Sequence, residues 1–518
     1  MLKDLIKDSY KHSIPGGIMM NRKLVAAFIL IIALIFPYDA IGIIDNYESD
    51  KREREVGSIN TEVVEASSVD KDTPYREKKK ETINLDTAFK HPIILDSHND
   101  TMMKVVDDKT WLPKVDLGKN TSFHIDIPKL RKGGLNIPFF AAYTEGYYGN
   151  TNRSISRTLA LINGLYYTEK NNPDTFKISK DLNEIANAVN EKKIAAVPTI
   201  EGAYSLDDDH SLELLNQYND LGIKAIGLTW NYSNKLGEGA SRVYGDKKKT
   251  VSSGGLTEHG KKVILEMNRL GIVVDVSHMA ESTFWDAVKT SKSPIIASHS
   301  GVNSIKKHNR NLDNKQLKAL GKSGGVMNIV FYPGFLRNGN VYVSDVVDHI
   351  DYVVKLIGMN HVGIGSDFDG ARMPKNLKDS SEMYKIRQEL LKRKYSPEDI
   401  DKIFGKNMLR VLKRVEEDAD HTQTSNSEIK IMPEYQMGQA IKTKTPNFKA
   451  KIESVNEIKS ARLIVDGKSY KALIDKNNKS ISFQLKTELK EKFHVFTFEV
   501  TDVKGNIQRE TRIFYIDN

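Results

Sequence analysis

Short apolar runs alternate with amphipathic segments through the middle of the chain. From Pro92 to about residue 416 there are eight such runs, and stretches between them such as 156–167, 256–270 and 343–358 repeat apolar residues at helical spacing. This alternation is typical of a parallel β-sheet whose strands are connected by helices. Eight units favour a closed barrel over an open doubly wound sheet, and no glycine-rich phosphate-binding sequence follows the first run. The predicted strands are PIIL (92–95), NIPFFAAY (136–143), IAAVPTI (194–200), IKAIGLTW (223–230), GIVVDVS (271–277), PIIAS (294–298), GVMNIVF (325–331) and HVGIGS (361–366).

The pattern changes after about residue 420. Helical spacing ends there, and the polar stretch HTQTSNSEIK reads as a linker, which we place at 421–440. The runs beyond it alternate polar and apolar residues and are separated by Asp, Asn, Gly and Lys turns, as in a β-sandwich. The segment VTDVKGN is similar to strand-turn segments of bacterial immunoglobulin-like modules. We therefore predict an immunoglobulin-like, all-β sandwich domain at 441–518, after a barrel at 86–420.

The N-terminal part differs from both of these regions in composition. Residues 45–85 are rich in Glu, Lys, Asp and Ser and poor in large apolar groups, so we predict a charged flexible linker. The uncharged apolar run 24–36 follows Arg22 and Lys23 and has the length of a signal-peptide core, although its extension through Ile44 also suits a membrane anchor. We predict that 1–44 is an N-terminal extension with a signal peptide or anchor, and that the protein is exported, either secreted or attached to the cell surface.

The amino-acid composition restricts the kinds of active site and partner that the chain can have. The 518 residues include no cysteine, which excludes disulfides, thiolate zinc sites and cysteine nucleophiles. Any metal must therefore be held by His, Asp and Glu. The net charge of +9 comes from 77 basic and 68 acidic residues without a dense basic block interleaved with aromatics. We therefore expect no nucleic-acid partner.

Polar residues gather where five of the eight predicted strands end, which is the face that carries catalytic groups in (β/α)8 barrels. Taken singly, each of them is more often a structural residue, but together on one face they indicate a metal site. Three histidines and two carboxylates can hold two ions if one carboxylate bridges them. Glu201 suits that role because it follows the third strand, between the two groups of ligands. The residues are His98 and Asp100, Glu201, His278, His299, and Asp367 and Asp369.

Several of these residues lie in short motifs along the chain. The motifs are SHND, PTIEGAYSL, LTWN, GLTEHGKKVILEMNRLGIVVDVSHM, PIIASHS, HNRN and VGIGSDFDG, with 21 residues from His278 to His299. Together they resemble, in order and over about residues 88–416, the membrane dipeptidase (renal dipeptidase) family of zinc peptidases. The resemblance implies a (β/α)8 TIM-type barrel of the metal-dependent hydrolase type.

The resemblance also implies roles for individual residues. It places one zinc ion on His98, Asp100 and Glu201 and a second on Glu201, His278 and His299, which makes two Zn2+ per chain. Arg310 would hold the substrate's C-terminal carboxylate, and Asp367 would handle protons of the attacking water and the leaving amine, with Glu201 as the second catalytic residue. The implied reaction is hydrolysis of dipeptides, including those with a C-terminal D-residue, by a bridging hydroxide.

The chain departs from the family at one substrate-contacting position. Animal members carry a histidine in the segment that matches LTWN, whereas this chain has Trp230 followed by Asn231. An indole donates one hydrogen bond but neither accepts nor titrates. We assign Trp230 and Asn231 to substrate binding, with a packing role as the alternative for Trp230, and we expect Asp369 to hydrogen-bond backbone around Gly370.

Two other functions stay open from the residues alone. One is a related binuclear amidohydrolase that acts on a non-peptide amide or ester. The other is a non-catalytic surface protein with a vestigial barrel, against which the intact set of site residues argues. We also expect cell-wall or membrane association through the N-terminus or the β-domain, and a dimer.

Overall fold

The computed structural model describes residues 83–144, 146, 151–208, 210–240, 254–420, 429–477 and 479–517. They belong to one compact unit, residues 79–518. The predicted signal peptide or anchor at 1–44, and the charged linker at 45–85 up to residue 82, lie outside the described residues and stay predictions. Within the described ranges, no helix is both long enough and apolar enough to cross a membrane.

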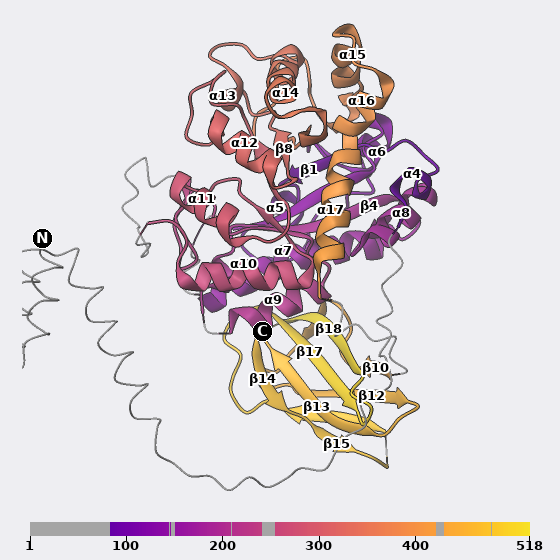
Figure 1. Ribbon diagram of the computed structural model, residues 1–518. Coiled ribbons are helices and arrows are strands. Elements are labelled where there is room, and N and C mark those ends of the chain that lie inside the picture. Colours follow the sequence, from indigo (N-terminus) through magenta and orange to yellow (C-terminus); the bar gives the residue numbers. More distant parts are fainter. Residues whose placement is uncertain are drawn as a thin grey trace, which may run out of the picture. The chain divides into compact units, whose positions relative to one another are not determined.

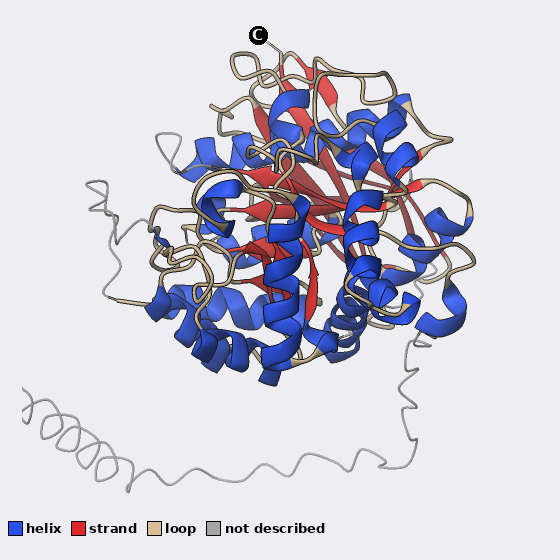
Figure 2. Ribbon diagram, turned by 90° about the horizontal axis from the view of Figure 1, so that it is seen from above, coloured by secondary structure: helices blue, strands red, loops and turns tan. Residues whose placement is uncertain are grey.

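The middle of the chain forms the predicted (β/α)8 barrel. Eight parallel strands neighbour one another in chain order, and an isolated parallel bridge between Asn99 and Phe368 joins the first strand to the segment after the last. Seen from above, the strands lie inside a ring of helices (Figure 2). Each predicted run overlaps one of the barrel strands, which are β1 (Leu95–Asn99), β2 (Ile137–Tyr143), β4 (Ile194–Glu201), β5 (Ala225–Gly227), β6 (Val273–Asp275), β7 (Ile295–Ser300), β8 (Val326–Ile329) and β9 (Val362–Ile364).

Several helices begin and end at residues that favour helix termini. α10 starts after Thr257, whose side chain accepts a hydrogen bond from Gly260 N–H, and it stops at Gly271, which has φ 72°. The helices are labelled in Figure 1 and coloured along the chain. They are α4 (Leu85–Ala88), α5 (Met102–Val105), α6 (Ile127–Gly133), α7 (Thr151–Asn171), α8 (Leu182–Asn190), α9 (Ser211–Asp220), α10 (Glu258–Leu270), α11 (Glu281–Thr290), α12 (Asn314–Lys322), α13 (Pro333–Leu336), α14 (Val343–Ile357), α15 (Tyr384–Lys392), α16 (Pro397–Asp401) and α17 (Asn407–Asp418), with short 3-10 turns η1 (Tyr204–Leu206), η3 (Met359–His361) and η4 (Ser380–Glu382) and the π-turn η5 (Lys402–Lys406).

Both faces of the barrel strands are buried. Along β2, Phe139 belongs to one apolar cluster and Phe140 to another, and β4 divides Val197 and Ala196 in the same way. Successive strand residues point to opposite faces, so a strand covered on both sides reads as a continuous apolar run. The sequence analysis did not predict β3 (Phe176–Ile178), a three-residue strand that pairs with β4 outside the main path.

The C-terminal part consists of two β-sheets that enclose their own apolar core, consistent with an immunoglobulin-like sandwich. One sheet has the order β10-β12-β16-β15 and the other β11-β18-β17-β13-β14. The first two strands begin inside the segment that we assigned to a linker. The strands are β10 (Ile429–Pro433), β11 (Gln439–Ile441), β12 (Asn447–Ser454), β13 (Ile458–Val465), β14 (Lys468–Lys471), β15 (Leu473–Asp475), β16 (Ser480–Gln484), β17 (Phe493–Asp502) and β18 (Ile507–Ile516).

The sandwich packs directly on the barrel's helices α7 and α9. Phe493, Val495 and Ile513 belong to the apolar cluster of the barrel itself. The buried Gln217 of α9 donates to Thr497 Oγ1 over 3.0 Å and accepts from Gly467 N–H over 2.8 Å. Because apolar and polar contacts cross the same boundary, the two domains share a packed interface.

A buried ion pair inside the sandwich makes stability depend on pH. His494 Nδ1 lies 2.6 Å from Asp466 Oδ2. Burial alone would lower the pKa of His494, but the charge of Asp466 outweighs it, so the pKa is raised. A raised folded-state pKa means that the stabilisation is fully present below the ordinary histidine pKa and is lost as pH rises through the folded value.

We therefore expect Asp466→Asn to lower the free energy of unfolding by about 2 kcal/mol at pH 6 and by clearly less at pH 9. Urea unfolding at both values measures this. Asp475→Asn, on the exposed strand β15, is the control and should change little at either pH. An equal loss at both pH values for Asp466→Asn would contradict the assigned ion pair.

Candidate metal centre

The predicted ligands come from separate strands and meet at one end of the barrel. His98 lies within β1 and His299 within β7, and both strands are irregular at those points, with register shifts between Asp96 and Asn99 and between Ala297 and Ser300. Such bulges redirect side chains next to functional sites. Glu201 is the last residue of β4.

Glu201 lies between two groups of ligands, and its two oxygens face different histidines. Oε2 is 3.4 Å from His98 Nε2, whereas Oε1 is 2.9 Å from His278 Nε2 and 3.4 Å from His299 Nε2. Asp100 Oδ2 is 3.6 Å from His98 Nε2 on the first side. The carboxylate is 5% exposed. One buried carboxylate therefore lies between two neighbouring sets of predicted ligands.

The donor atoms have the chemistry and spacing of metal ligands. Two groups that share Glu201, namely His98 with Asp100 and His278 with His299, each present ligand atoms within 4.8 Å of one another. His98 Nε2 and Asp100 Oδ1 are buried and have no hydrogen-bond partner among the described residues. Buried polar atoms without partners are costly unless something else satisfies them. Imidazole and carboxylate donors without thiolates fit zinc.

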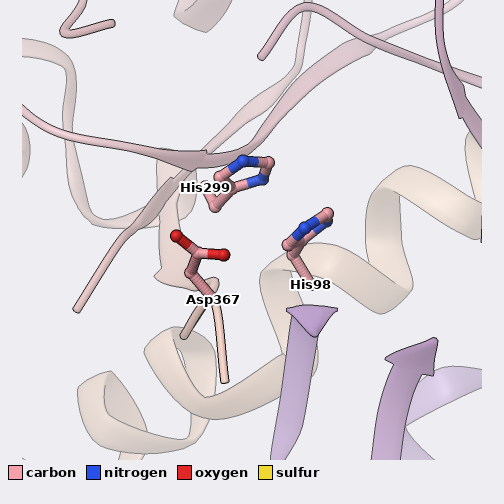
Figure 3. Close-up of side chains that lie close together, drawn as sticks. All are labelled: His98, His299 and Asp367. Atoms are coloured by element: carbon pink, nitrogen blue, oxygen red, sulfur yellow. The ribbon is translucent and has the colours of Figure 1, made fainter. Parts of the chain in front are cut away.

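Asp367 joins the same cluster from the segment after β9. Figure 3 shows its carboxylate directed toward the rings of His98 and His299, with which it forms a third group of potential ligand atoms. The two rings stack with centroids 3.7 Å apart. Burial, together with the charge of Asp100, raises the pKa of Asp367 well above its usual range. The group is therefore suited to carry a proton.

The surroundings of Glu201, His278 and His299 favour the forms of these three groups that bind a cation. Burial alone would raise the pKa of Glu201, but the charge of His98 outweighs it and holds the pKa well below its usual range. Burial, and then the charge of Arg310, lowers the pKa of His278 to about 3. Burial, followed by His98, also lowers the pKa of His299. A carboxylate and two neutral imidazoles are the forms that coordinate metal.

The backbone is strained at two site residues. His278 has φ 66° and Asp367 has φ 62°, in the left-handed region that non-glycine residues rarely adopt. Such conformations persist when surrounding contacts hold them, and they cluster at functional sites. Gly370 contributes in another way, because a Cβ there would overlap Asp100 Oδ2 and lie 2.7 Å from Asp367 Oδ1.

Arg310 is buried beside the His299 strand. Its Nη2 donates to the carbonyl of His299 over 3.1 Å, and its Nη1 donates to Ser300 Oγ over 3.3 Å. The guanidinium also lies over the ring of Phe335, 5.4 Å from the centroid. Since its charge helps to lower the pKa of His278, it acts within the same site. This placement is compatible with the predicted role in binding a substrate carboxylate.

Trp230 and Asn231 also lie beside the candidate ligands, and Asn231 contacts His278 directly. Asn231 Oδ1 is 2.8 Å from His278 Nδ1, so the amide supports that histidine. Trp230 packs 5.8 Å from the His278 ring and 5.4 Å from the rings of Tyr143 and Tyr232. Substrate binding by either residue stays a prediction.

Asp369 belongs to the supporting structure of the loop. Its side chain accepts from the backbone N–H groups of His124 and Ile125 over 2.8 and 3.2 Å and from Thr101 Oγ1 over 2.8 Å. A hydrogen-bonding role in the loop was expected, but the partners lie in a distant segment and not around Gly370.

The sequence analysis missed a set of supporting residues behind the ligands. Asp96 accepts from Ser366 N–H over 2.7 Å and Oγ–H over 2.6 Å, and Ser366 directly precedes Asp367. Asp275 bonds the N–H and Oγ of Ser298, which directly precedes His299. The signal was present as an Asp two or three residues before a histidine, in DSH and DVSH.

Comparison of the chain with known proteins finds similarity to dipeptidases. A family model described as membrane dipeptidase (peptidase family M19) matches residues 84–426. An uncharacterized dipeptidase of Schizosaccharomyces pombe is 34% identical over 350 residues, which cover 63% of this chain and 81% of that protein.

Solved structures show the same barrel. A metallopeptidase from Rhodobacter sphaeroides, solved with a phosphinate mimic of the dipeptide L-Ala-D-Ala, is 24% identical and superposes with a TM-score of 0.56 over 63% of this chain and 100% of that chain. A dipeptidase described as a metallopeptidase of family M19 is 25% identical, with a TM-score of 0.56 over 62% of this chain and 98% of that chain.

The close approach at Gly370 can be tested by adding a side chain. In Gly370→Ala the new methyl group displaces the Asp100 carboxylate, so we expect zinc affinity to fall roughly 10- to 100-fold, as when the support of a metal ligand is lost. Chelator competition measures it. Gly227→Ala, at a buried glycine, is the control, since a Cβ there has no neighbour nearer than 3.7 Å. Equal zinc affinity in both variants would show that Asp100 is not a ligand.

Proposed function

The chain belongs to the membrane dipeptidase family, peptidase family M19, and we propose that it hydrolyses dipeptides with the help of two zinc ions. Membership makes it a hydrolytic enzyme of a metallopeptidase family. The observation that carries the finer proposal is the placement of Glu201, whose two carboxylate oxygens face different sets of imidazoles. A single-ion site has no need of that arrangement.

The residues that would hold the ions follow from the two groups around Glu201. His98 and Asp100 would bind one ion, His278 and His299 the other, and Glu201 both. When bound, such ions lower the pKa of water to near neutrality and polarise a carbonyl oxygen. The protein's part is to hold the five side chains buried and fixed in orientation.

Asp367 is the proposed proton carrier. Its carboxylate faces His98 and His299 (Figure 3), and burial raises its pKa well above the usual range. A carboxyl group with a raised pKa can take a proton from the attacking water and later give it to the leaving amine. Its backbone is fixed by the hydrogen bond from Asp367 N–H to His98 O, 3.1 Å long.

Arg310 is the proposed anchor for the substrate's free carboxylate. A guanidinium remains charged and pairs with a carboxylate through two parallel hydrogen bonds. Because Arg310 is held by the His299 carbonyl, its distance from the ligands is set by the barrel. A fixed distance selects a short substrate whose carboxylate lies one residue from the bond that is cut. Dipeptides with a C-terminal L- or D-residue both offer such a group.

We also propose that the protein acts outside the cytoplasm. The support is the apolar run 24–36 after Arg22 and Lys23, which has the form of a signal-peptide core. The absence of cysteine from the chain is compatible with an oxidising environment.

The function is tested by combining metal analysis with a panel of L-Xaa-L-Xaa and L-Xaa-D-Xaa dipeptides. We expect two zinc ions per chain, turnover that chelation abolishes, and recovery on adding zinc back. N-acetyl amino acid amides, which carry an amide bond but no free carboxylate, are the matched control and should be poor substrates. A zinc-loaded protein that cleaves the controls and leaves all dipeptides intact would instead indicate an amidohydrolase of another specificity.

The role of Arg310 is tested with Arg310→Lys, which keeps the charge but cannot form two parallel hydrogen bonds. We expect kcat/KM for dipeptides to fall roughly 10- to 100-fold, the equivalent of about 1.4 to 3 kcal/mol, with zinc content unchanged. Arg337→Lys is the control, since this half-exposed arginine pairs with Asp345 away from the site. Unchanged dipeptide kinetics in Arg310→Lys would remove the arginine from substrate binding.

A further inference from the structure

Asp275 lies directly behind the two histidines on the His278 side of the site. It ends β6, is 6% exposed, and accepts from Ser277 N–H and Ser298 N–H through Oδ1, both over 2.9 Å. Its other oxygen, Oδ2, accepts from Ser298 Oγ. These two serines directly precede His278 and His299. One buried carboxylate thus fixes the backbone just before two metal ligands.

The hydrogen bonds have a defined direction. An ionised carboxylate only accepts, so the single proton of Ser298 Oγ goes to Asp275. Ser298 Oγ is also 2.9 Å from His299 Nδ1, and with its proton already used it must accept from Nδ1–H. A neutral imidazole carries one proton, so Nε2 of His299 is left with a free lone pair. That nitrogen is the atom that faces Glu201.

We propose that Asp275 is a positioning residue that, acting through Ser298 Oγ, keeps the proton of His299 on Nδ1 and so presents Nε2 to the metal. The inference rests on the proposed two-zinc function and deepens it. His278 has a corresponding support, because Asn231 Oδ1 lies 2.8 Å from its Nδ1 and an amide oxygen accepts only. Both imidazoles on this side are therefore held with the same nitrogen toward the ion.

A second pair of Asp and Ser makes the same hydrogen bonds elsewhere in the barrel. Comparing the two pairs separates placement of the backbone from orientation of a histidine ring. Asp96 also bonds the N–H and Oγ of a serine, Ser366, that precedes a site residue. The residue that follows is Asp367, which has no ring to orient. The shared part of the arrangement is therefore backbone placement, and the control of a histidine tautomer is specific to Asp275, Ser298 and His299.

Asp275→Asn tests the proposal with little change in shape. The amide oxygen can still accept from the two backbone N–H groups, but the amide nitrogen only donates. Ser298 Oγ–H can then turn and donate to His299 Nδ1, which at 2.9 Å is nearer than its other acceptor, Ser277 Oγ, at 3.4 Å, and this moves the ring proton to Nε2. We expect the affinity for one of the two zinc ions to fall roughly 10- to 100-fold, so that the chain retains one ion at zinc concentrations that fill both sites of the natural protein.

The control is Asp379→Asn. Asp379 is buried and accepts from the N–H and Oγ of Ser381 over 3.0 and 2.6 Å, and it belongs to none of the potential metal groups among the described residues. It should leave both zinc affinities unchanged. Ser298→Ala is a second variant that removes the Oγ link and keeps the backbone bond to Asp275, so it should weaken the same ion if Asp275→Asn does not fold.

Two measurements decide the outcome. Chelator competition gives the two affinities, and side-chain 15N spectra of the zinc-loaded natural protein show which nitrogen of His299 carries the proton. The proposal requires the proton on Nδ1; a proton on Nε2, or two unchanged zinc affinities in the folded variants, overturns it. A natural protein that binds fewer than two zinc ions would instead contradict the proposed function, so the two failures are distinguishable.

Discussion

The site depends on burying one carboxylate between two sets of imidazoles. Burial of Glu201 disfavours its charge, and only the surrounding histidines keep it ionised. Without a cation, the cluster leaves buried atoms of His98 and Asp100 without hydrogen-bond partners. Burying charged groups in this way costs several kcal/mol of desolvation free energy. The arrangement is therefore costly in itself and is explained by the cations that we propose it binds.

The barrel meets that requirement by building the site from the ends of distant strands. The candidate ligands lie on or directly after β1, on β4 and β7, and after β6, and the irregular register of β1 and β7 turns His98 and His299 toward Glu201. Behind them, Asp96 and Asp275 bind the serines that precede site residues. Strained backbone at His278 shows that local geometry has been adapted to the site. The packed sandwich adds support from outside, through helices α7 and α9.

Much of the fold could be predicted because the chain carries strong local signals. The barrel strands are buried on both faces and read as apolar runs, and α10 is marked by Thr257 before it and Gly271 after it. The strand β3 has three residues, which are too few to show the alternation of a strand. The strand β10 begins directly after a polar segment, so its start is not visible in the sequence pattern. Short elements of this kind are defined by their pairing partners, which a linear pattern does not contain.

The grouping of the candidate ligands could be predicted, but the residues that support them could not. The face of the barrel and the recurrence of His, Asp and Glu at strand ends were sufficient to find Glu201 and its neighbours. The contact of Asn231 with His278 and the bonds from Asp275 to Ser298 join residues that are far apart in the chain or on different strands. Sequence spacing alone does not reveal which hydrogen bonds form across a barrel.

The central claim is that Glu201 is shared by two metal ions. Anomalous diffraction at the zinc edge from crystals of the zinc-loaded protein tests it most directly. The account predicts two peaks, one beside His98 and Asp100 and one beside His278 and His299, each in contact with a different oxygen of Glu201. A single peak at full zinc occupancy, or two peaks of which only one contacts Glu201, would contradict it.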